Sequence, residues 1–164
     1  MNARATESPG HSPRILVIGY GNELRGDDGA GRKLAEEVEG WGLEEVDTLS
    51  VRQLTPDLAA EIAGRPRVVF ADATAASEGN TEVKVMGLTI GQTVAARSHH
   101  CGPSELLSLA AQLNGRIPDC FLLTIPGECF DWTDKLSPRA ADNFLIALEK
   151  TRELILPRHS LSEA

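Results

Sequence analysis

The sequence lacks the features of a membrane or secreted protein. No stretch approaches the ~18 uninterrupted apolar residues of a membrane-spanning helix, and residues 1–13 hold no apolar segment after a basic start. Cysteine is scarce, with only Cys101, Cys120 and Cys129. An odd number of cysteines without a CxxC pair does not suit a disulfide scaffold. We therefore expect a cytoplasmic protein with no membrane partner.

Positively charged residues are fewer than negatively charged ones. Sixteen Lys and Arg residues stand against twenty-four Asp and Glu residues, a net charge of −8 that repels phosphate backbones. Nucleic acid is therefore not an expected partner. Of the 164 residues, 41 % are hydrophobic and 24 % are charged, which is ordinary globular usage. We expect one domain over residues 14–156, a disordered tail at 1–13, an exposed tail at 157–164, and a monomer.

Apolar patterning predicts an α/β fold. In chain order, strands are expected at 14–18, 45–51, 67–72, 82–88 and 120–125, and helices at 30–39, 55–64, 102–114 and 137–156. The alternation of strands and helices in the first half indicates a parallel sheet covered on both faces. Residues 73–80 are too few for a parallel crossover, so the strand at 82–88 is predicted to be antiparallel. The fold class is thus a three-layer α/β fold, a twisted, mostly parallel sheet of about five strands with one antiparallel strand and helices on both faces.

Some local patterns make sharper predictions about single elements. Val83 and Val85 alternate with Lys84 and its neighbours, which predicts an edge strand with one solvated face. Thr55 and Ser137 each precede a proline, and this order predicts that each residue caps the N-terminus of a helix.

Three polar clusters are expected at the carboxyl edge of the parallel strands, where open α/β sheets bind ligands. Their acidic and histidine side chains are Asp27, Asp28, Asp72, His99 and His100. The two adjacent aspartates belong to a glycine-rich loop at 19–29, and Asp72 is predicted to end a buried strand. The loop after residue 88 can span up to ~35 Å, enough to carry His99 to the same edge. One imidazole and two carboxylates can then meet.

Each of these features also has a structural interpretation. The glycine-rich loop is similar to a dinucleotide-binding motif. However, Leu24 occupies the position of the third glycine, and the two carboxylates would repel a pyrophosphate. Asp27 or Asp28 could cap the following helix, Asp72 could form an Asx turn, and loop histidines are commonly surface residues. Cys101 is expected to be a small buried hydrophobe rather than a ligand.

Three ordered motifs carry a family resemblance. They are ILVIGYGNELRGDDGAG at 15–31, VVFADA at 68–73 and SHHCGPSELL at 98–107. With these motifs the sequence resembles the hydrogenase maturation endopeptidases, which clip a C-terminal extension from the large subunit of nickel-iron hydrogenases. The likeness runs from about residue 15 to residue 156. It implies the same α/β fold that the strand directions predict.

The resemblance also implies a site and a metal. It places the metal-contacting and catalytic side chains on Asp28, Asp72 and His99. Some family members have Glu where this chain has Asp28. The implied metal is nickel, already inserted into the precursor, so that the nickel-loaded large-subunit precursor is the expected partner. Zinc or another divalent ion could occupy such a mixed oxygen and nitrogen site in isolation.

Four further residues are second-tier candidates near the same edge: Asn22, Asp27, His100 and Glu128. Adjacent side chains of an extended loop point to opposite sides, and the family pattern selects His99 over His100. The alternative function is a non-catalytic metal-dependent binding module or chaperone for the hydrogenase large subunit. The two functions are separated at this point only by the family resemblance.

Overall fold

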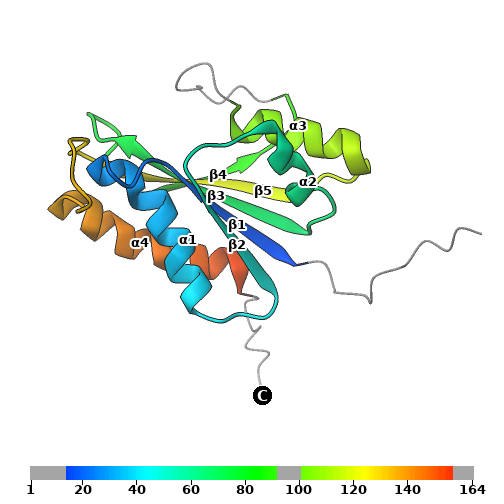
Figure 1. The fold of residues 1–164 in the computed structure, drawn as a ribbon, viewed down its shortest axis with the longest axis horizontal. Helices are drawn as coiled ribbons and strands as arrows, with labels where there is room; N and C mark the ends of the chain where they lie inside the picture. Colours follow the sequence, from blue (N-terminus) through cyan, green and yellow to red (C-terminus); the bar gives the residue numbers. More distant parts are fainter. Residues whose placement is uncertain (1–13, 92–100, 157–164) are drawn as a thin grey trace, which may run out of the picture.

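The chain folds around one mixed β-sheet (Figure 1). The computed structural model describes residues 14–91 and 101–156. Its strands are β1 (Ile15–Tyr20), β2 (Val46–Val51), β3 (Arg67–Ala75), β4 (Lys84–Leu88) and β5 (Asp119–Gly127), in the spatial order β2-β1-β3-β5-β4. Neighbouring strands are parallel except β4, which runs antiparallel to β5. The predicted fold class is confirmed, including its antiparallel strand.

Helices cover both faces of this sheet. They are α1 (Ala30–Gly40), α2 (Ala59–Ile62), α3 (Pro103–Asn114) and α4 (Pro138–Ile155), with 3-10 turns η1 (Gly26–Gly29) and η2 (Pro56–Leu58) before the first two. In Figure 1, α1 and α4 lie on one face, and α2 and α3 lie on the other. Among the described residues, no helix is long and apolar enough to cross a bilayer.

The two faces of the central strands β1 and β3 fill two separate cores. Val17 and Val69 belong to the core on the side of α1 and α4, whereas Ile18 and Phe70 belong to the core under α2 and α3. All four side chains are fully buried, because these strands have covers on both faces. Each burial of this kind is worth ~1.5–3 kcal/mol. The strands that carry the predicted site are therefore the best anchored part of the sheet.

Two glycines allow α1 to begin directly on the sheet. A Cβ atom on Gly31 would lie 2.3 Å from the carbonyl oxygen of Ala71, and one on Gly19 would lie 2.0 Å from the carbonyl oxygen of Gly31. Both distances are far below van der Waals contact, so a larger residue at either position would push α1 away from β1 and β3. This close packing holds η1, which carries both predicted aspartates, against β3.

β1 and β5 each end two residues later than predicted, and β3 and β4 differ more clearly from their predicted form. β3 continues three residues beyond Asp72, because its pairing with β5 extends to Ala75 opposite Gly127. Asp72 therefore lies within the strand rather than at its end. The alternation predicted for β4 is wrong, since Val85 and Met86 are equally exposed at 38 %. β4 is an edge strand whose residues Lys84 to Gly87 are all exposed, and only Leu88 at its end is buried.

One of the two predicted helix caps is confirmed. The Ser137 hydroxyl accepts a 3.2 Å hydrogen bond from the backbone N–H of Ala140, as expected for the N-cap of α4. Thr55 precedes η2 but makes no side-chain cap hydrogen bond. The N–H group of Leu58 that a capping hydroxyl would bind is already donated to the Thr55 carbonyl oxygen at 3.0 Å, because the segment starts as a 3-10 turn.

Candidate functional site

The turn after β1 places Asp28. Gly21 has a φ of 141°, and a Cβ atom there would lie 2.0 Å from the carbonyl oxygen of Asp28, so this position requires glycine. The backbone N–H of Asn22 donates a 2.8 Å hydrogen bond to Oδ2 of Asp28. The Asp28 side chain is half-buried, and its other oxygen has no hydrogen bond from residues 14–91 or 101–156. Asp28 is thus oriented by one backbone donor and keeps coordinating capacity.

Asp72 lies beside the same turn on the neighbouring strand. The parallel register of β1 and β3 sets Asp72 level with Tyr20. The Tyr20 side chain is hydrogen-bonded to the Asp72 carboxylate, and burial, followed by the charge of this carboxylate, raises the pKa of Tyr20 above its usual range. The phenol stays protonated and so donates to Asp72. Asp28 and Asp72 therefore each lie beside the segment from Tyr20 to Asn22.

Asp27 is a structural residue, although it stands next to Asp28 in the chain. Its buried carboxylate accepts four hydrogen bonds of 2.6–2.9 Å, which come from the N–H groups of Glu128, Cys129 and Ser137 and from the Ser137 hydroxyl. Burial by itself would raise the pKa of this carboxyl, but the hydrogen bonds outweigh burial and hold the pKa below its usual value. With its lone pairs engaged in this way, Asp27 is not suited to bind a metal ion.

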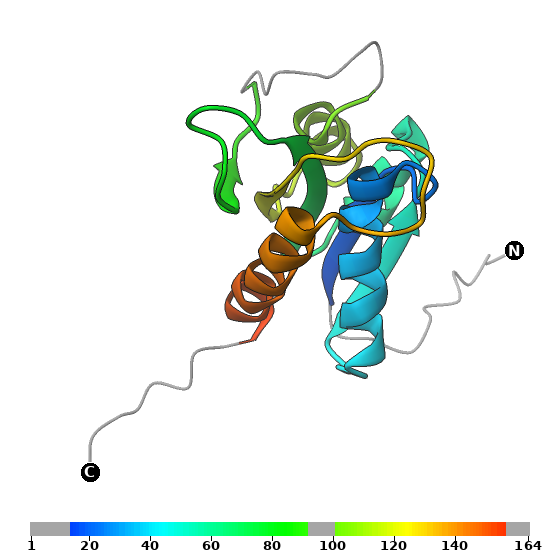
Figure 2. The same cartoon turned by 90° about the vertical axis from the view of Figure 1, so that its left-hand side faces the viewer.

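Backbone hydrogen bonds tie the two loops around Asp27 together. The N–H of Gly26 donates to the Thr133 carbonyl at 2.8 Å, and the N–H of Thr133 donates to the Leu24 carbonyl at 3.1 Å. Gly26 adopts a φ of 56°, and a Cβ atom there would lie 2.6 Å from the carbonyl oxygen of Cys129. Figure 2 shows the loop between β5 and α4 passing beside the N-terminal end of α1. The surface next to Asp28 is therefore built from two segments far apart in sequence.

The other sequence candidates have identifiable roles. Asn22 contributes its backbone to Asp28, and its side-chain oxygen accepts a 3.0 Å hydrogen bond from the Leu24 N–H as an Asx turn. Glu128 has an exposed side chain that forms a 3.2 Å ion pair with Arg139, so it is engaged outside the turn after β1. Neither Asp27 nor Asp28 caps α1, whose N-cap is Gly29. The capping interpretation of the two aspartates is therefore wrong.

The predicted nitrogen donor belongs to a pair of adjacent histidines. His99 and His100 lie outside the described residues, and their roles stay predictions. Within residues 14–91 and 101–156, no group of three His, Cys, Asp or Glu side chains is arranged to hold a metal ion. Cys101 packs against the core on the side of α3, and burial, followed by the charge of Glu105, raises the pKa of its thiol. This agrees with the structural role predicted for Cys101.

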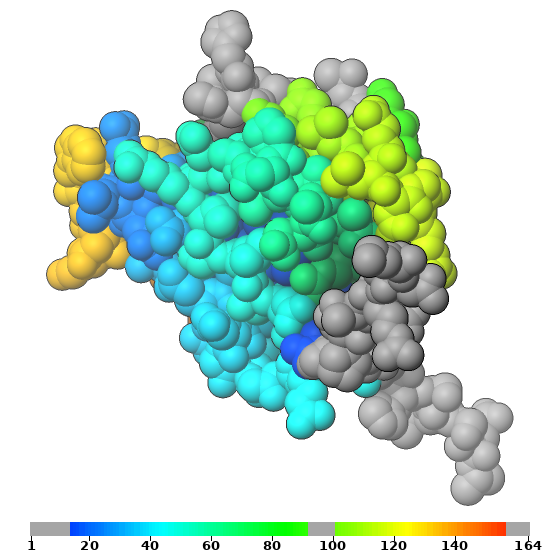
Figure 3. All heavy atoms as spheres, turned by 45° about the vertical axis from the view of Figure 1, so that its right-hand side comes forward, coloured from blue at the N-terminus to red at the C-terminus, as the bar shows by residue number. Residues whose placement is uncertain are grey.

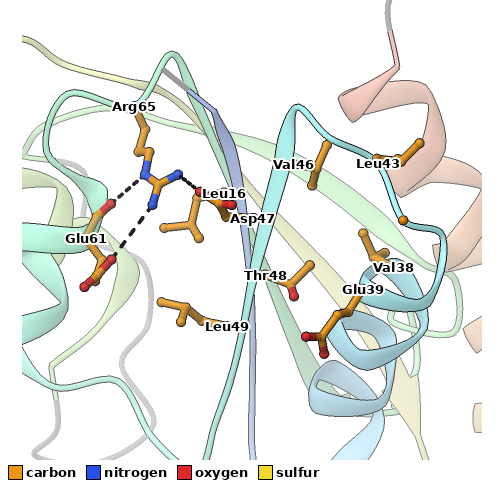
Figure 4. A pocket seen from close by; sticks show the side chains of 11 residues that line it. Leu16, Val38, Glu39, Leu43, Val46, Asp47, Thr48, Leu49, Glu61 and Arg65 are labelled. Atoms are coloured by element: carbon orange, nitrogen blue, oxygen red, sulfur yellow. Dashed lines mark hydrogen bonds and ion pairs between the residues drawn. The ribbon is translucent and has the colours of Figure 1, made fainter. Parts of the chain in front are cut away.

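A cavity of about 400 Å³ lies at the opposite edge of the sheet, where β1 and β2 begin (Figure 4). The Arg65 guanidinium crosses it, bonded to the Asp47 carboxylate and lying 3.8 Å from the Glu61 carboxylate. These two acidic groups thus have a cationic partner, which Asp28 lacks among the described residues. Leu16, near the start of β1, lines the cavity. The two site aspartates lie at the other end of β1. The cavity is a separate feature.

Sequence reasoning missed two residues that position the site. Tyr20 donates to Asp72, and Ser137 supplies two of the four hydrogen bonds to Asp27. A signal existed for Tyr20, because it directly follows the strand predicted at 14–18 and belongs to the same glycine-rich loop as Asp28. Ser137 is 110 residues from Asp27, and no local pattern connects the two.

Comparison with known proteins finds close likeness in structure. No protein-family model matches the chain, and no curated protein matches it in sequence. The fold is similar to that of the nickel-iron hydrogenase maturation protease HybD from Thermococcus kodakarensis, with a TM-score of 0.72 and 27 % identity over 87 % of this chain and 99 % of that one. An endopeptidase from Escherichia coli matches with a TM-score of 0.65 and 25 % identity, over 86 % and 93 % of the two chains. HybD from E. coli matches with a TM-score of 0.67 and 21 % identity, over 86 % and 91 %.

Proposed function

We propose that the chain, which resembles the hydrogenase maturation proteases in fold and in sequence motifs, is an endopeptidase that removes the C-terminal extension of a nickel-iron hydrogenase large-subunit precursor. The observation that carries the proposal is the convergence of Asp28 and Asp72 on the turn after β1, at the edge where α/β sheets bind ligands. The protein acts as a cytoplasmic monomer on a precursor that already contains nickel.

The two carboxylates suit a divalent ion as a donor set. Asp28 keeps a carboxylate oxygen without a partner among the described residues, and His99 is the predicted nitrogen donor. Two oxygen donors and one imidazole fit nickel or zinc better than calcium. In the proposed reaction the nickel is part of the substrate. A divalent ion in such a position polarises a carbonyl group or lowers the pKa of a bound water.

The chain itself orients these carboxylates and accepts a proton. The Asn22 N–H fixes the direction of Asp28, and the Tyr20 hydroxyl fixes that of Asp72. The single donor to Asp28 leaves lone pairs of its carboxylate for the reacting groups. One of the two carboxylates then accepts the proton of the water that attacks the scissile carbonyl, and it passes this proton to the departing amine as the C–N bond breaks. The arrangement therefore supports hydrolysis without a Ser, Cys or Thr nucleophile.

The decisive experiment compares two forms of one substrate. The purified protein is incubated with the nickel-loaded precursor or with the metal-free precursor, and the intact masses are measured. We expect the nickel-loaded form to lose its C-terminal extension, while the metal-free form and casein keep their mass. Stable binding without a change of mass would favour the chaperone alternative. Equal cleavage of both precursor forms would contradict the requirement for nickel.

The two adjacent histidines can be separated in the same assay. We expect His99→Ala to abolish nickel-dependent processing and His100→Ala to retain measurable activity, with at most a ~10 to 100-fold loss if His100 orients a ligand. Circular dichroism checks that both variants are folded. The reverse order of activities would show that the assignment is off by one residue.

A further inference from the structure

Two large apolar side chains are exposed beside the site. Leu24 is 60 % exposed and lies four residues before Asp28, and Trp132 is 74 % exposed in the loop between β5 and α4. The Arg25 guanidinium lies over the Trp132 ring, 5.6 Å from its centroid. We name these three residues the Leu24–Trp132 patch. Single exposed apolar residues are common, but an exposed tryptophan stacked with arginine beside another apolar residue is typical of a binding surface.

Backbone contacts hold the patch in place. The Leu24 carbonyl accepts the N–H of Thr133 at 3.1 Å, and Arg25 pairs with Thr133 as an isolated parallel bridge. Asp27, two residues after Arg25, joins the same two segments, because its buried carboxylate accepts four hydrogen bonds from the loop between β5 and α4. Figure 3 shows the two segments, in blue and gold, side by side at one end of the molecule. A surface ordered before binding loses less conformational entropy when a partner arrives.

The residue types define the chemistry of the partner. Leu24 and Trp132 provide apolar area, and Trp and Arg are the residue types that most often dominate binding energies. Arg25 has no carboxylate partner within residues 14–91 and 101–156. The patch therefore fits a protein surface that presents an apolar side chain together with a carboxylate.

The position of the patch identifies the partner protein that binds there. Leu24 and Arg25 belong to the same turn as Asp28, so a macromolecule that brings its scissile bond to Asp28 also lies against them. We propose that the Leu24–Trp132 patch is the docking surface for the hydrogenase large-subunit precursor, which binds there through an apolar side chain and a carboxylate. This inference rests on the proposed function and adds the residues that recognise the substrate.

Steady-state processing kinetics of the nickel-loaded precursor test the proposal. We expect Trp132→Ala to raise KM about tenfold or more with kcat unchanged, because the patch binds substrate but does not touch the reacting bond. Trp132→Phe keeps an aromatic ring and should restore most of the affinity. The control is Leu113→Ser, since Leu113 is also a large exposed apolar residue, at 64 %, but lies at the C-terminal end of α3, near the opposite edge of the sheet. Its KM should equal that of the wild type.

The possible results are distinguishable. A wild-type enzyme that cleaves the precursor, together with a Trp132→Ala variant of unchanged KM, would overturn the docking surface and leave the proposed function intact. A loss of kcat without a change in KM would also overturn it. Sedimentation that shows a wild-type dimer and a Trp132→Ala monomer would assign the patch to a second copy of this chain. A wild-type protein that leaves the precursor uncut would overturn both proposals.

Discussion

Asp27 and Asp28 are the same residue type at adjacent positions, yet their surroundings differ completely. Asp27 is fully buried and accepts four hydrogen bonds from the loop between β5 and α4. Asp28 is half-buried and accepts one, from the turn after β1. Successive side chains in a 3-10 turn point about 120° apart, so η1 directs Asp27 toward the loop between β5 and α4 and Asp28 toward the turn after β1. The surroundings, and not the residue type, separate the structural acid from the candidate catalytic acid.

A third aspartate shows why hydrogen bonds from the backbone matter in this comparison. Asp47 is paired with Arg14 and Arg65 at the opposite edge, and these partners hold the pKa of its carboxyl below the usual value. Its side chain is 36 % exposed, so solvent screens these ion pairs. The donors to Asp27 are three backbone N–H groups and the Ser137 hydroxyl, and all four lose their acceptor if this fully buried carboxylate is removed. Asp47 is therefore the appropriate control for Asp27.

The largest effect is expected from Asp27→Ala. The change leaves three backbone N–H groups and one hydroxyl without their acceptor, and we expect the free energy of unfolding to fall by ~3–5 kcal/mol. Asp47→Ala should cost at most ~1 kcal/mol. Urea denaturation at neutral pH measures both. Equal losses in the two variants would contradict the structural role assigned to Asp27.

The next largest effect concerns activity rather than stability. Asp28→Asn and Asp72→Asn should each slow processing of the nickel-loaded precursor by ~100-fold or more, equivalent to ~2.7 kcal/mol in the barrier. The melting temperature should stay unchanged or rise, because each change removes a charge beside another carboxylate. Wild-type cleavage by either variant would show that the residue is not in the site.

A smaller loss of stability is expected from Gly127→Ala. A Cβ atom on Gly127 would lie 2.5 Å from the Cβ of Asp27, so the variant must displace the buried carboxylate. We expect a loss of ~1–3 kcal/mol in thermal or urea unfolding. The control is Gly40→Ala in the last position of α1, where a Cβ atom meets nothing within 4 Å. A neutral Gly127→Ala would show that the Asp27 site tolerates rearrangement.

The smallest effect is on the pH dependence of stability. The pKa of Asp27 is lowered in the folded protein, so its ionised form stabilises the fold above the unfolded pKa of ~3.9. This contribution is lost as the pH falls from there through the folded pKa. Asp27→Asn should therefore have a shallower decline of unfolding free energy below pH ~4 than the wild type. Parallel curves in urea titrations at several pH values would argue against a lowered pKa.

Much of the site could be predicted because of one topological rule. Parallel strands end at a common edge, so Asp28 after β1 and Asp72 in β3 are predicted to lie close together, and in the structure each lies beside the segment from Tyr20 to Asn22. The sequence does not predict which of Asp27 and Asp28 is the buried structural residue and which is the candidate site residue. This difference depends on Ser137, which only the packing of α4 and its preceding loop brings to Asp27. The meeting of His99 with these residues stays a prediction.

The sequence by itself determined the elements and the direction of the strands. Local periodicity marks which residues must be buried, and the short link at 73–80 excludes a parallel crossover, so the antiparallel β4 followed from chain length alone. The tertiary structure decided how far β3 runs, since its last residues up to Ala75 are held by pairing with β5. It also decided which aspartate is buried and which side chains form the Leu24–Trp132 patch. These properties depend on contacts between distant segments, and such contacts leave no periodic signal in either segment alone.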